Sequence, residues 1–375
     1  MKKQLLFCTD GIFPHAVGGM QKHSLLLIEQ LVKYTDWEII VIHPHAQNVL
    51  TEKRSVKEIS IPFDFSGFYI WKQYQYSKKV ASIIEQYPEA IVYAQGFAVL
   101  HHLKKFGNRV IINQHGLEPF QGLTKNDRLK TGPMRMMERY QFNYAAKVIS
   151  LGGRLTSILK KEIYFNEDKI VVIPNAVDAC ELPNKNFEKD QLQLLYVGRF
   201  AFNKGIDVLL ETISNLHRDG YKSKLTFHIV GKGPLFEKYT HEYQLENVVY
   251  EGFASEERLK ELYETSDLFV FPTLFEGMPT VVLEAMVHGM PVVVSNTGAI
   301  AELVDRKNGY LVDAGNKRAF KTAIQSYYQL SSEDKRKMSE TSRARVMDNF
   351  TWEIVGRKHI ELFESMLPST PLKKL

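Results

Sequence analysis

The sequence predicts an α/β protein built from two doubly wound domains in tandem. Short apolar runs alternate with amphipathic helical segments along most of the 375 residues, a pattern typical of sheets that carry helices on both faces. The apolar runs are continuous rather than alternating, so the strands are expected to be parallel and buried on both faces. A chain of this length suits two domains of similar size. We therefore expect two Rossmann-like domains that face each other across a cleft.

The first half of the chain is expected to form one of these domains, over residues 1–177. Apolar residues recur at helical spacing over Met20–Tyr34 and Trp71–Tyr87, which predicts two of its helices. Its strands are expected at Leu5–Cys8, Glu38–Ile42, Glu58–Ile61, Ala90–Tyr93, Val110–Asn113, Val148–Ser150 and Ile170–Ile173.

The segment PNAVDACELPNKNFEKD interrupts this alternation with proline, asparagine and charged residues, which predicts a linker over 178–190. A second domain is expected over 191–350, with helices near 205–218, 234–244, 256–264 and 280–288. Its strands are expected at Leu194–Val197, Leu225–Val230, Val248–Tyr250, Leu268–Phe271, Val292–Ser295 and Tyr310–Val312.

The charge is distributed unevenly between the two halves. Residues 1–177 carry 23 Lys and Arg against 15 Asp and Glu, whereas the remainder carries 25 against 28. A basic first half suggests an anionic partner, although a solvated basic surface has the same composition. No apolar run reaches the ~18 residues of a membrane span. Cys8 and Cys180 are far apart and outside any C-x-x-C motif, so reduced thiols in a cytoplasmic protein are expected.

Several motifs of other enzyme classes are absent from the sequence. Gly231-Lys232-Gly233 is followed by Pro234-Leu235-Phe236, so G-x-G-x-x-G is incomplete, and no G-x-x-x-x-G-K-[ST] occurs. No two aspartates stand in a D-x-D arrangement. A nicotinamide enzyme and a metal-dependent transferase are therefore disfavoured, and neither a metal nor a cofactor is expected.

Two pairs of residues suit an anion at the end of a strand. Gly18 and Gly19 lie between the first strand and its helix, where backbone N–H groups can approach a phosphate, although a plain tight turn needs the same residues. Arg199 and Lys204, in YVGRFAFNKGID, follow the first strand of the second domain without a nearby acid. This position favours binding of a diphosphate over the alternative of solvated surface cations.

Three further residues follow strands in the same way. Gly231 and Phe253 are expected to frame a nucleotide base, although each alone is a weak signal. His115 follows the fifth strand of the first domain, beside Gly116, which is expected to leave room for a ligand. A structural histidine is the alternative, but the position favours a functional role.

The stretch FEGMPTVVLEAMVHG contains two carboxylates near a predicted helix start. A helix N-terminus favours a phosphate, so adjacent acids are better suited to neutral hydroxyl groups. We expect Glu276 to bind a hexose and Glu284 to bind the ribose diol. A capping acid and a surface acid are the alternative, which explains Glu284 poorly because its neighbours are apolar.

These motifs together resemble the retaining glycosyltransferases of glycosyltransferase family 4, which have the GT-B fold. The matches occur in the expected order, and Ala176 replaces the glycine of the family's common IPNGVD. They are GGMQKH, the HG at His115, IPNAVD, VGRF with NKG, IVGKGP, EGF and FEGMPTVVLEAMVHG.

The resemblance implies transfer of a hexose from a nucleotide sugar, UDP-linked, to a saccharide or glycolipid acceptor in cell-surface polysaccharide or lipopolysaccharide synthesis. It implies metal independence, and a C-terminal helix over 351–375 that crosses back to the first domain with Trp352 and Phe363 in its contacts. It assigns catalytic roles to His115, Glu276, Arg199 and Lys204. The donor-binding residues that we expect are Gly18, Gly19, Arg199, Lys204, Gly231, Phe253, Glu276, Gly277, Met278, Thr280, Val281 and Glu284.

Two other classes of function stay open at this point. A sugar-nucleotide epimerase of GT-B shape would act on the same donor without an acceptor. A nucleic-acid-binding module would need aromatic residues among basic ones, and residues 125–147 come nearest. That segment also suits an amphipathic helix on anionic lipid, so a peripheral position at the inner membrane face is expected and nucleic acid is not.

Overall fold

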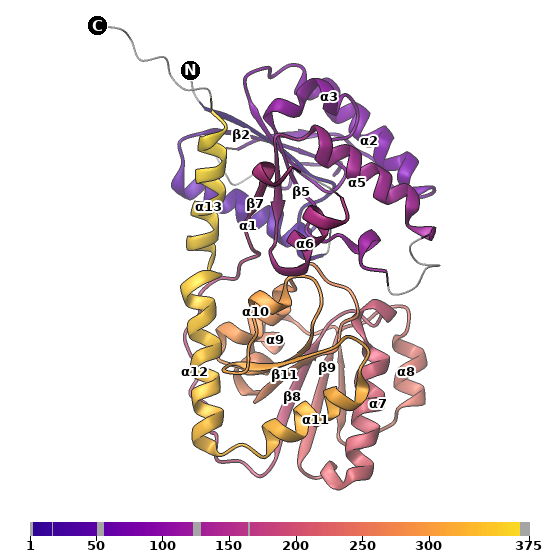
Figure 1. Ribbon diagram of the computed structural model, residues 1–375, viewed down its shortest axis with the longest axis vertical. Coiled ribbons are helices and arrows are strands. Elements are labelled where there is room, and N and C mark those ends of the chain that lie inside the picture. The colour runs from indigo at the N-terminus through magenta and orange to yellow at the C-terminus, as the bar shows by residue number, and fades with distance from the viewer. Residues whose placement is uncertain (1–2, 17, 51–55, 123–128, 164–165, 368–375) are drawn as a thin grey trace, which may run out of the picture. The chain divides into compact units, whose positions relative to one another are not determined.

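The computed structural model describes residues 3–16, 18–50, 56–122, 129–163 and 166–367 (Figure 1). The chain divides into two compact units, one formed by Met1–Asn175 with Trp352–Leu375 and the other by Ala176–Thr351. Each unit contains one parallel sheet. The predicted α/β class is therefore confirmed.

The first unit contains a seven-stranded sheet in the order β3-β2-β1-β4-β5-β6-β7. All its neighbouring strands are parallel, and most of their residues are buried because helices cover both faces. Every strand predicted in this half is confirmed, with bounds that differ by at most two residues. The strands are β1 (Gln4–Cys8), β2 (Glu38–His43), β3 (Val56–Ser60), β4 (Ile91–Gln95), β5 (Val110–Asn113), β6 (Lys147–Ser150) and β7 (Ile170–Val172).

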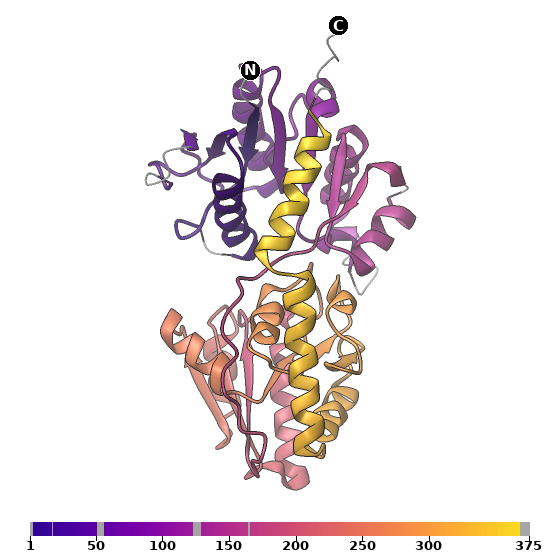
Figure 2. The ribbon, with the colours of Figure 1, turned by 90° about the vertical axis from the view of Figure 1, so that its left-hand side faces the viewer.

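Most helices of the first unit connect successive strands, but α13 comes from the C-terminal end of the chain. Figure 2 shows α13 beside α1. The Phe363 ring is fully buried, with its centroid 5.5 Å from that of Tyr93, and Trp352 is 3% exposed. The helices are α1 (Gly19–Tyr34), α2 (Tyr69–Ile84), α3 (Leu103–Phe106), α5 (Gly132–Tyr144), α6 (Gly153–Lys161) and α13 (Trp352–Ser365).

The second unit contains a six-stranded parallel sheet in the order β10-β9-β8-β11-β12-β13. The order reverses between β8 and β11, and open α/β sheets bind ligands beyond the carboxyl ends of the strands at such a reversal. All six predicted strands are confirmed. They are β8 (Leu192–Val197), β9 (Leu225–Val230), β10 (Val248–Gly252), β11 (Leu268–Phe271), β12 (Val292–Ser295) and β13 (Gly309–Val312).

Helices cover both faces of this second sheet, with α7 and α8 on one side and α9, α10 and α12 on the other (Figure 1). α12 begins at a Ser331 cap whose hydroxyl accepts a hydrogen bond from the Asp334 N–H at 3.1 Å. The helices are α7 (Ile206–Leu216), α8 (Phe236–Glu242), α9 (Glu256–Thr265), α10 (Thr280–Val287), α11 (Lys317–Tyr328) and α12 (Ser332–Asn349). None of the helices within the described part of the chain combines the length and apolar character that a bilayer crossing requires.

Residues 178–190 have almost no regular structure and run along the second unit. Lys185 donates a hydrogen bond of 2.6 Å to the Ser266 carbonyl, and Lys189 pairs with Asp267 at 2.7 Å. Arg343 of α12 donates to the Cys180 carbonyl at 2.5 Å. This segment is therefore fixed by side chains rather than by a strand or helix of its own.

Candidate active site

In the second unit, the loops that follow β8 and β11 lie against each other. Gly205 has a φ of +66°, and a Cβ atom there would lie 1.8 Å from the Pro272 carbonyl oxygen. Only glycine allows this approach. Hydrogen bonds of 2.9 Å to the Asn203 carbonyl, from the Leu274 N–H and the Thr273 hydroxyl, hold the two loops together.

This contact brings Lys204 and Glu276 into an ion pair between the Lys204 Nζ and the Glu276 Oε1. Glu276 is 9% exposed, and the Thr273 hydroxyl lies 3.4 Å from the same oxygen. The expectation that neither cation has an acid nearby is therefore wrong for Lys204. Its physical reason is topological: β8 and β11 are neighbours in the sheet, so residues 72 positions apart meet at its edge.

Arg199, the other predicted cation, is exposed. No described acidic side chain forms an ion pair with it, so its guanidinium is free to bind an anion. The buried Tyr196 hydroxyl supports the loop from below, lying 3.5 Å from the Arg199 carbonyl and 3.4 Å from the Lys204 carbonyl. The loop thus presents one free cation and one paired cation at the reversal point of the sheet.

The N-terminus of α10 opens at the same edge. Its N-cap residue is Pro279, which provides no side-chain hydrogen bond to the first turn, so the N–H groups of Thr280 and Val281 have no side-chain cap. Uncapped N–H groups at a helix start attract phosphate oxygens. Met278, just before it, is 3% exposed.

Glu284 lies one turn into α10 and is half-buried. Its Oε2 accepts a hydrogen bond of 2.9 Å from the hydroxyl of buried Tyr263. Burial and the adjacent carboxylate raise the pKa of Tyr263 well above its usual value, so this hydroxyl remains a donor. Tyr263 also stacks on His288, with ring centroids 5.3 Å apart. These contacts orient the Glu284 carboxylate.

Gly231 and Phe253 follow β9 and β10. Gly231 has a φ of +127°, and a Cβ atom there would lie 2.1 Å from the Gly198 carbonyl oxygen, so only glycine fits. The Phe253 side chain is 80% exposed, with the Lys232 ammonium 5.8 Å from its ring centroid. An exposed ring at this edge offers a stacking surface.

Gly298, just after β12, was not among the predicted site residues. A Cβ atom there would lie 2.1 Å from the Gly277 carbonyl oxygen and 2.3 Å from the Glu276 carbonyl oxygen. The adjacent Ala299 N–H donates to the Gly277 carbonyl at 2.8 Å. Gly298 therefore supports the backbone of the Glu276 turn. The signal for it was a glycine three residues beyond a predicted strand, similar to that of Gly231, which follows its predicted strand directly.

The other predicted residues belong to the first unit. Gly19 begins α1, which has no side-chain N-cap, and nothing lies within 4 Å of a Cβ atom placed there. The start of this helix is therefore open. Gly18 precedes it in an extended conformation, with φ 162°.

His115 lies beyond the carboxyl end of β5, in the left-handed region with a φ of +52°, a conformation uncommon for residues other than glycine. Its N–H donates to the Asn113 side chain at 3.1 Å, and its Nε2 lies 3.1 Å from the Gln95 amide nitrogen. The His23 ring packs edge-on against it, with centroids 4.5 Å apart. Burial and the nearby His359 lower the pKa of His115 to about 3, so its imidazole is neutral near pH 7.

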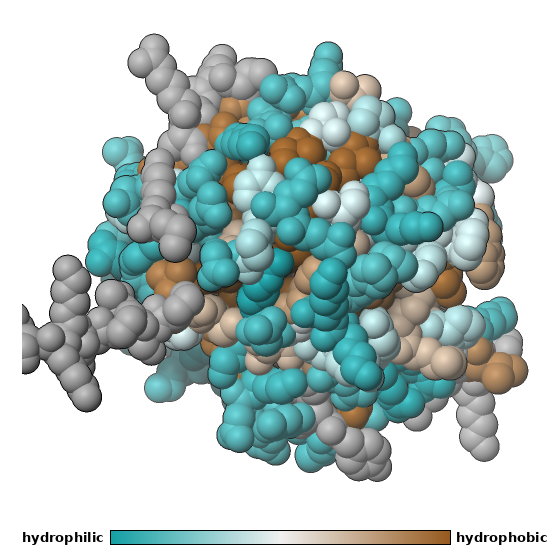
Figure 3. Space-filling view, turned by 90° about the horizontal axis from the view of Figure 1, so that it is seen from above, coloured by the Kyte–Doolittle hydropathy of each residue, from teal (hydrophilic) through white to brown (hydrophobic). Residues whose placement is uncertain are grey.

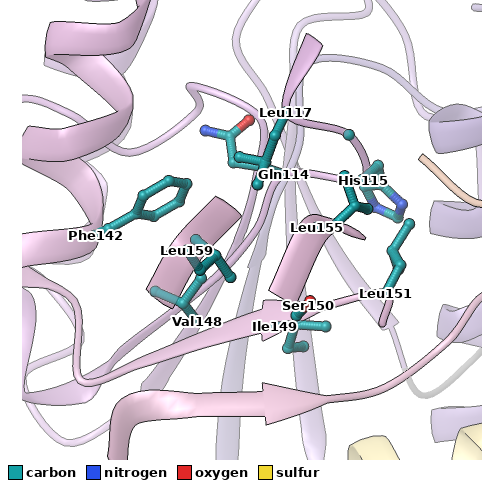
Figure 4. A pocket seen from close by; sticks show the side chains of 11 residues that line it. Gln114, His115, Leu117, Phe142, Val148, Ile149, Ser150, Leu151, Leu155 and Leu159 are labelled. Atoms are coloured by element: carbon teal, nitrogen blue, oxygen red, sulfur yellow. The ribbon is translucent and has the colours of Figure 1, made fainter. Parts of the chain in front are cut away.

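The space beside His115 is smaller than the sequence suggests. A Cβ atom at Gly116 would lie 2.3 Å from the Glu118 carboxylate, so that side chain fills the room expected there. A pocket behind His115 has a volume of about 10 Å³, close to that of one water molecule. Figure 4 shows mainly aliphatic side chains around it, with the His115 imidazole at one edge. A sugar does not fit in this pocket.

Solved structures with the same fold include a sucrose-phosphate synthase and a protein in complex with UDP-glucose. Sucrose-phosphate synthase from Thermosynechococcus elongatus superposes with a TM-score of 0.80 at 18% identity, over 98% of this chain and 99% of that one. HepE from Anabaena, solved in complex with UDP-glucose, gives a TM-score of 0.72 at 18% identity, over 96% and 99% of the two chains. These matches confirm the GT-B fold.

Two relatives illustrate the range of similar sequences. An uncharacterized glycosyltransferase of Methanocaldococcus jannaschii is 25% identical over 94% of this chain and 95% of its own length. The Escherichia coli UDP-Gal:alpha-D-GlcNAc-diphosphoundecaprenol alpha-1,3-galactosyltransferase is 28% identical over 51% of this chain. That match spans about half of the relative, 53% of its length.

Two family models match successive parts of the chain. The model described as Glycosyltransferase Family 4 matches residues 17–180. The model described as Glycosyl transferases group 1 matches residues 191–329. Together they span most of the chain and leave out residues 1–16, 181–190 and 330–375. The chain therefore belongs to the group 1 glycosyltransferases of glycosyltransferase family 4.

Proposed function

We propose that this glycosyltransferase moves a hexose from a UDP-linked donor to a saccharide or lipid-linked saccharide, with retention of configuration and without a metal ion. The observation that carries this proposal is the arrangement of charges at the reversal point of the second sheet. Arg199 is exposed there and forms no ion pair with a described acidic residue, and the Lys204–Glu276 pair and the uncapped start of α10 lie at the same edge. Two cations and a helix N-terminus suit the two negative phosphates of a nucleoside diphosphate.

Each residue at this edge has a role in the proposed reaction. Arg199 and Lys204 neutralise the charge that develops on the diphosphate as the glycosidic bond breaks. The diphosphate competes with Glu276 for Lys204, which frees the carboxylate to accept hydrogen bonds from sugar hydroxyls. Glu284, already oriented by Tyr263, binds the ribose hydroxyls, and Phe253 packs on the base.

Retention follows from attack of the acceptor hydroxyl on the same face as the leaving phosphate. A phosphate oxygen then takes the acceptor proton, so Glu276 is not required as a covalent nucleophile. We assign to His115, with the Gly18–Gly19 backbone at the start of α1, contact with the donor sugar and its phosphate. A neutral imidazole suits this role because it can exchange hydrogen bonds with sugar hydroxyls without repelling the cations.

Relatives and structural neighbours support the choice of donor and pathway. HepE is solved with UDP-glucose, and the galactosyltransferase relative is named for a UDP-Gal donor and a diphosphoundecaprenol-linked acceptor. These names favour a uridine nucleotide and synthesis of a cell-surface polysaccharide.

A lipid-linked acceptor would bring the enzyme to an anionic membrane surface, and we propose a peripheral contact through the first unit. Within the described part of the segment 125–147, Met136 is 73% exposed and Arg139 is exposed on α5, while residues 125–128 lie outside the described residues. Figure 3 shows a face of this unit covered mostly by hydrophilic side chains, with hydrophobic ones in small separate groups. Such a surface suits electrostatic binding more than deep insertion. Sedimentation with anionic vesicles, but not with zwitterionic ones, is the expected result.

A thermal-shift screen with UDP, GDP and ADP, followed by their sugars, tests the donor. UDP should raise the melting temperature most, and UDP-hexose turnover should persist in excess chelator. Loss of activity with chelator and its return with manganese would contradict metal independence. An added saccharide acceptor should increase turnover of the donor. An epimerase would instead convert the donor sugar without any acceptor.

A further inference from the structure

The carboxyl edge of the first sheet contains a cluster of polar side chains around the Tyr69 hydroxyl. Asp10 lies two residues beyond β1, Tyr69 and Gln73 are on α2, and Glu138 is on α5. The charges of Asp10, Glu118 and Glu138 all act on the Tyr69 hydroxyl, and the Gln73 side chain hydrogen bonds to it. Four separate segments therefore converge on one place.

Contacts with Gly96, just past β4, place this cluster at the sheet edge. A Cβ atom at Gly96 would lie 3.7 Å from the Asp10 Oδ2. The Gln141 amide, one turn after Glu138 on α5, donates to the Gly96 carbonyl at 3.0 Å. Gln95, the preceding residue, contacts His115. The cluster therefore lies close to the histidine that we assign to the donor sugar.

Three oxygens of the cluster have no hydrogen-bond partner among the residues that the structure describes. They are Oδ1 of Asp10, Oε1 of Gln73 and Oε2 of Glu138. Gln73 is 2% exposed and Glu138 is 3% exposed. Buried oxygens without partners are unfavourable and rare in folded proteins, so a set of three in one place indicates a missing hydrogen-bond donor.

We propose that Asp10, Gln73 and Glu138 form a subsite for the saccharide that receives the transferred hexose. Their side chains would hydrogen bond to the hydroxyl groups of a neutral sugar. The inference rests on the proposed function. The Asp10 and Gln73 oxygens accept hydrogen bonds, and the protonated Glu138 carboxyl can accept or donate one. Sugar hydroxyls suit this set because each can both donate and accept. Tyr69 is 44% exposed, so its ring lies at the open side of the cluster and offers a surface for the sugar to pack on.

The acidic character of the cluster also selects against anions. Burial raises the pKa of Asp10 to about 6 and, with the neighbouring Glu118, the pKa of Glu138 to about 8. At pH 7 one negative charge therefore remains on this pair, and a carboxylate or phosphate on the ligand would be repelled. This local preference is opposite to that of the unit as a whole, which is basic. An anionic part of the acceptor must bind elsewhere on the unit.

The test uses the full chain and the donor found in the nucleotide screen. Transfer to p-nitrophenyl glucoside, glucosaminide and glucuronide is measured, and each rate is divided by the rate of donor hydrolysis without acceptor. Wild type should transfer to the glucoside and glucosaminide at least tenfold better than to the glucuronide.

Gln73→Leu removes one acceptor oxygen and should reduce the transfer-to-hydrolysis ratio at least tenfold, mainly through a higher KM for the glucoside. Gln75→Leu is the matched control, because it makes the same change on the same helix at a residue without an assigned role. If Gln73→Leu does not fold, Asp10→Asn keeps an acceptor oxygen but removes the charge that remains at pH 7. It should raise glucuronide transfer about tenfold, whereas Glu138→Gln, which replaces a carboxyl that is mostly neutral at pH 7, should not.

Three results would overturn the subsite. They are a glucuronide preference in wild type, donor hydrolysis without transfer to any of the three glycosides, and unchanged ratios in Gln73→Leu and Asp10→Asn. Unchanged ratios would mean that ordered water satisfies these oxygens. Absence of turnover with every nucleotide sugar is a different outcome, because it would contradict the proposed function itself.

Discussion

The carboxyl edges of the two sheets differ in the burial and pairing of their polar side chains. At the edge of the second sheet, charged side chains are exposed or paired, as in Arg199 and the Lys204–Glu276 ion pair. At the edge of the first sheet, polar groups are buried and several oxygens have no described partner. The pKa values of buried His23 and His359 are lowered there, and those of Asp10 and Glu138 are raised. Burial thus favours the neutral form of each group.

This difference suits two kinds of ligand. A diphosphate brings two or three negative charges and needs cations to pair with. Those cations are best left hydrated until the diphosphate binds, because burying an unpaired charge is costly. A sugar brings only hydroxyl groups, and buried partners discriminate among such groups better than solvated ones because water does not compete. The same fold therefore presents a charged edge in one unit and a largely neutral edge in the other.

The strongest test of this contrast is removal of the cations of the second unit. Arg199→Ala or Lys204→Ala should reduce kcat/KM for the donor by ~2–4 kcal/mol in transition-state terms, the range for loss of a preorganised charge donor. Steady-state kinetics with the identified donor is the measurement. Arg306→Ala is the control, because Arg306 is also exposed but lies before β13, at the opposite edge. Wild-type kinetics in both site variants would show that Arg199 and Lys204 do not bind the diphosphate.

Glu276 and Glu284 of the second unit should differ in which ligand they affect, the nucleotide or the sugar. Glu284→Ala should weaken binding of free UDP by about 1.5–3 kcal/mol, because a ribose contact is common to nucleotide and nucleotide sugar. Glu276→Ala should lower turnover by a similar amount, and UDP affinity should stay the same or increase, because the ion pair with Lys204 is gone. Calorimetric titration with UDP alone distinguishes them. Loss of UDP binding in Glu276→Ala only would reverse the two roles.

The stability of the first unit should decrease at acid pH because it contains buried, neutral histidines. The pKa of His359 is lowered to about 4, below the usual 6.5, because the ring is fully buried. The folded state then binds fewer protons than the unfolded state between these values, so stability decreases as pH falls through this range. At pH 5 this one histidine should cost about 2 kcal/mol relative to pH 7.

Unfolding of His359→Gln at pH 7 and pH 5 measures this contribution, since the variant should lose about 2 kcal/mol less between the two conditions. Asp10 and Glu138 act in the opposite direction, because their pKa values are raised, but their effects cancel in the comparison with wild type. His241→Gln, at an exposed residue of α8, should leave the pH dependence unchanged. Equal losses in wild type and His359→Gln would show that folding does not lower the pKa of His359.

The sequence predicted those parts of the fold that depend on a pattern of neighbouring residues. Most strands are largely apolar runs between polar turns, and Arg199, Lys204 and Glu276 lie in the loops that follow β8 and β11. The ion pair between Lys204 and Glu276 was missed because it depends on which strands are neighbours, which no local pattern determines. The cluster of Asp10, Gln73 and Glu138 was missed for the same reason. Its members come from three separate elements, and none has a distinctive neighbourhood in the sequence.

The smallest expected effect concerns Gly298, which was missed although its signal was local. Gly298→Ala should destabilise the second unit by about 1 kcal/mol more than Gly220→Ala, at the lower end of the cost of overpacking. Both glycines have positive φ, +52° and +84°, so both variants include the backbone cost of a left-handed alanine. Only at Gly298 does the new Cβ atom meet backbone, 2.1 Å from the Gly277 carbonyl oxygen, whereas nothing lies within 4 Å at Gly220. The difference in unfolding free energy therefore isolates the close approach. Because that approach is to the turn of Glu276, turnover should fall in Gly298→Ala but not in Gly220→Ala, and equal turnover would show that the turn does not depend on this contact.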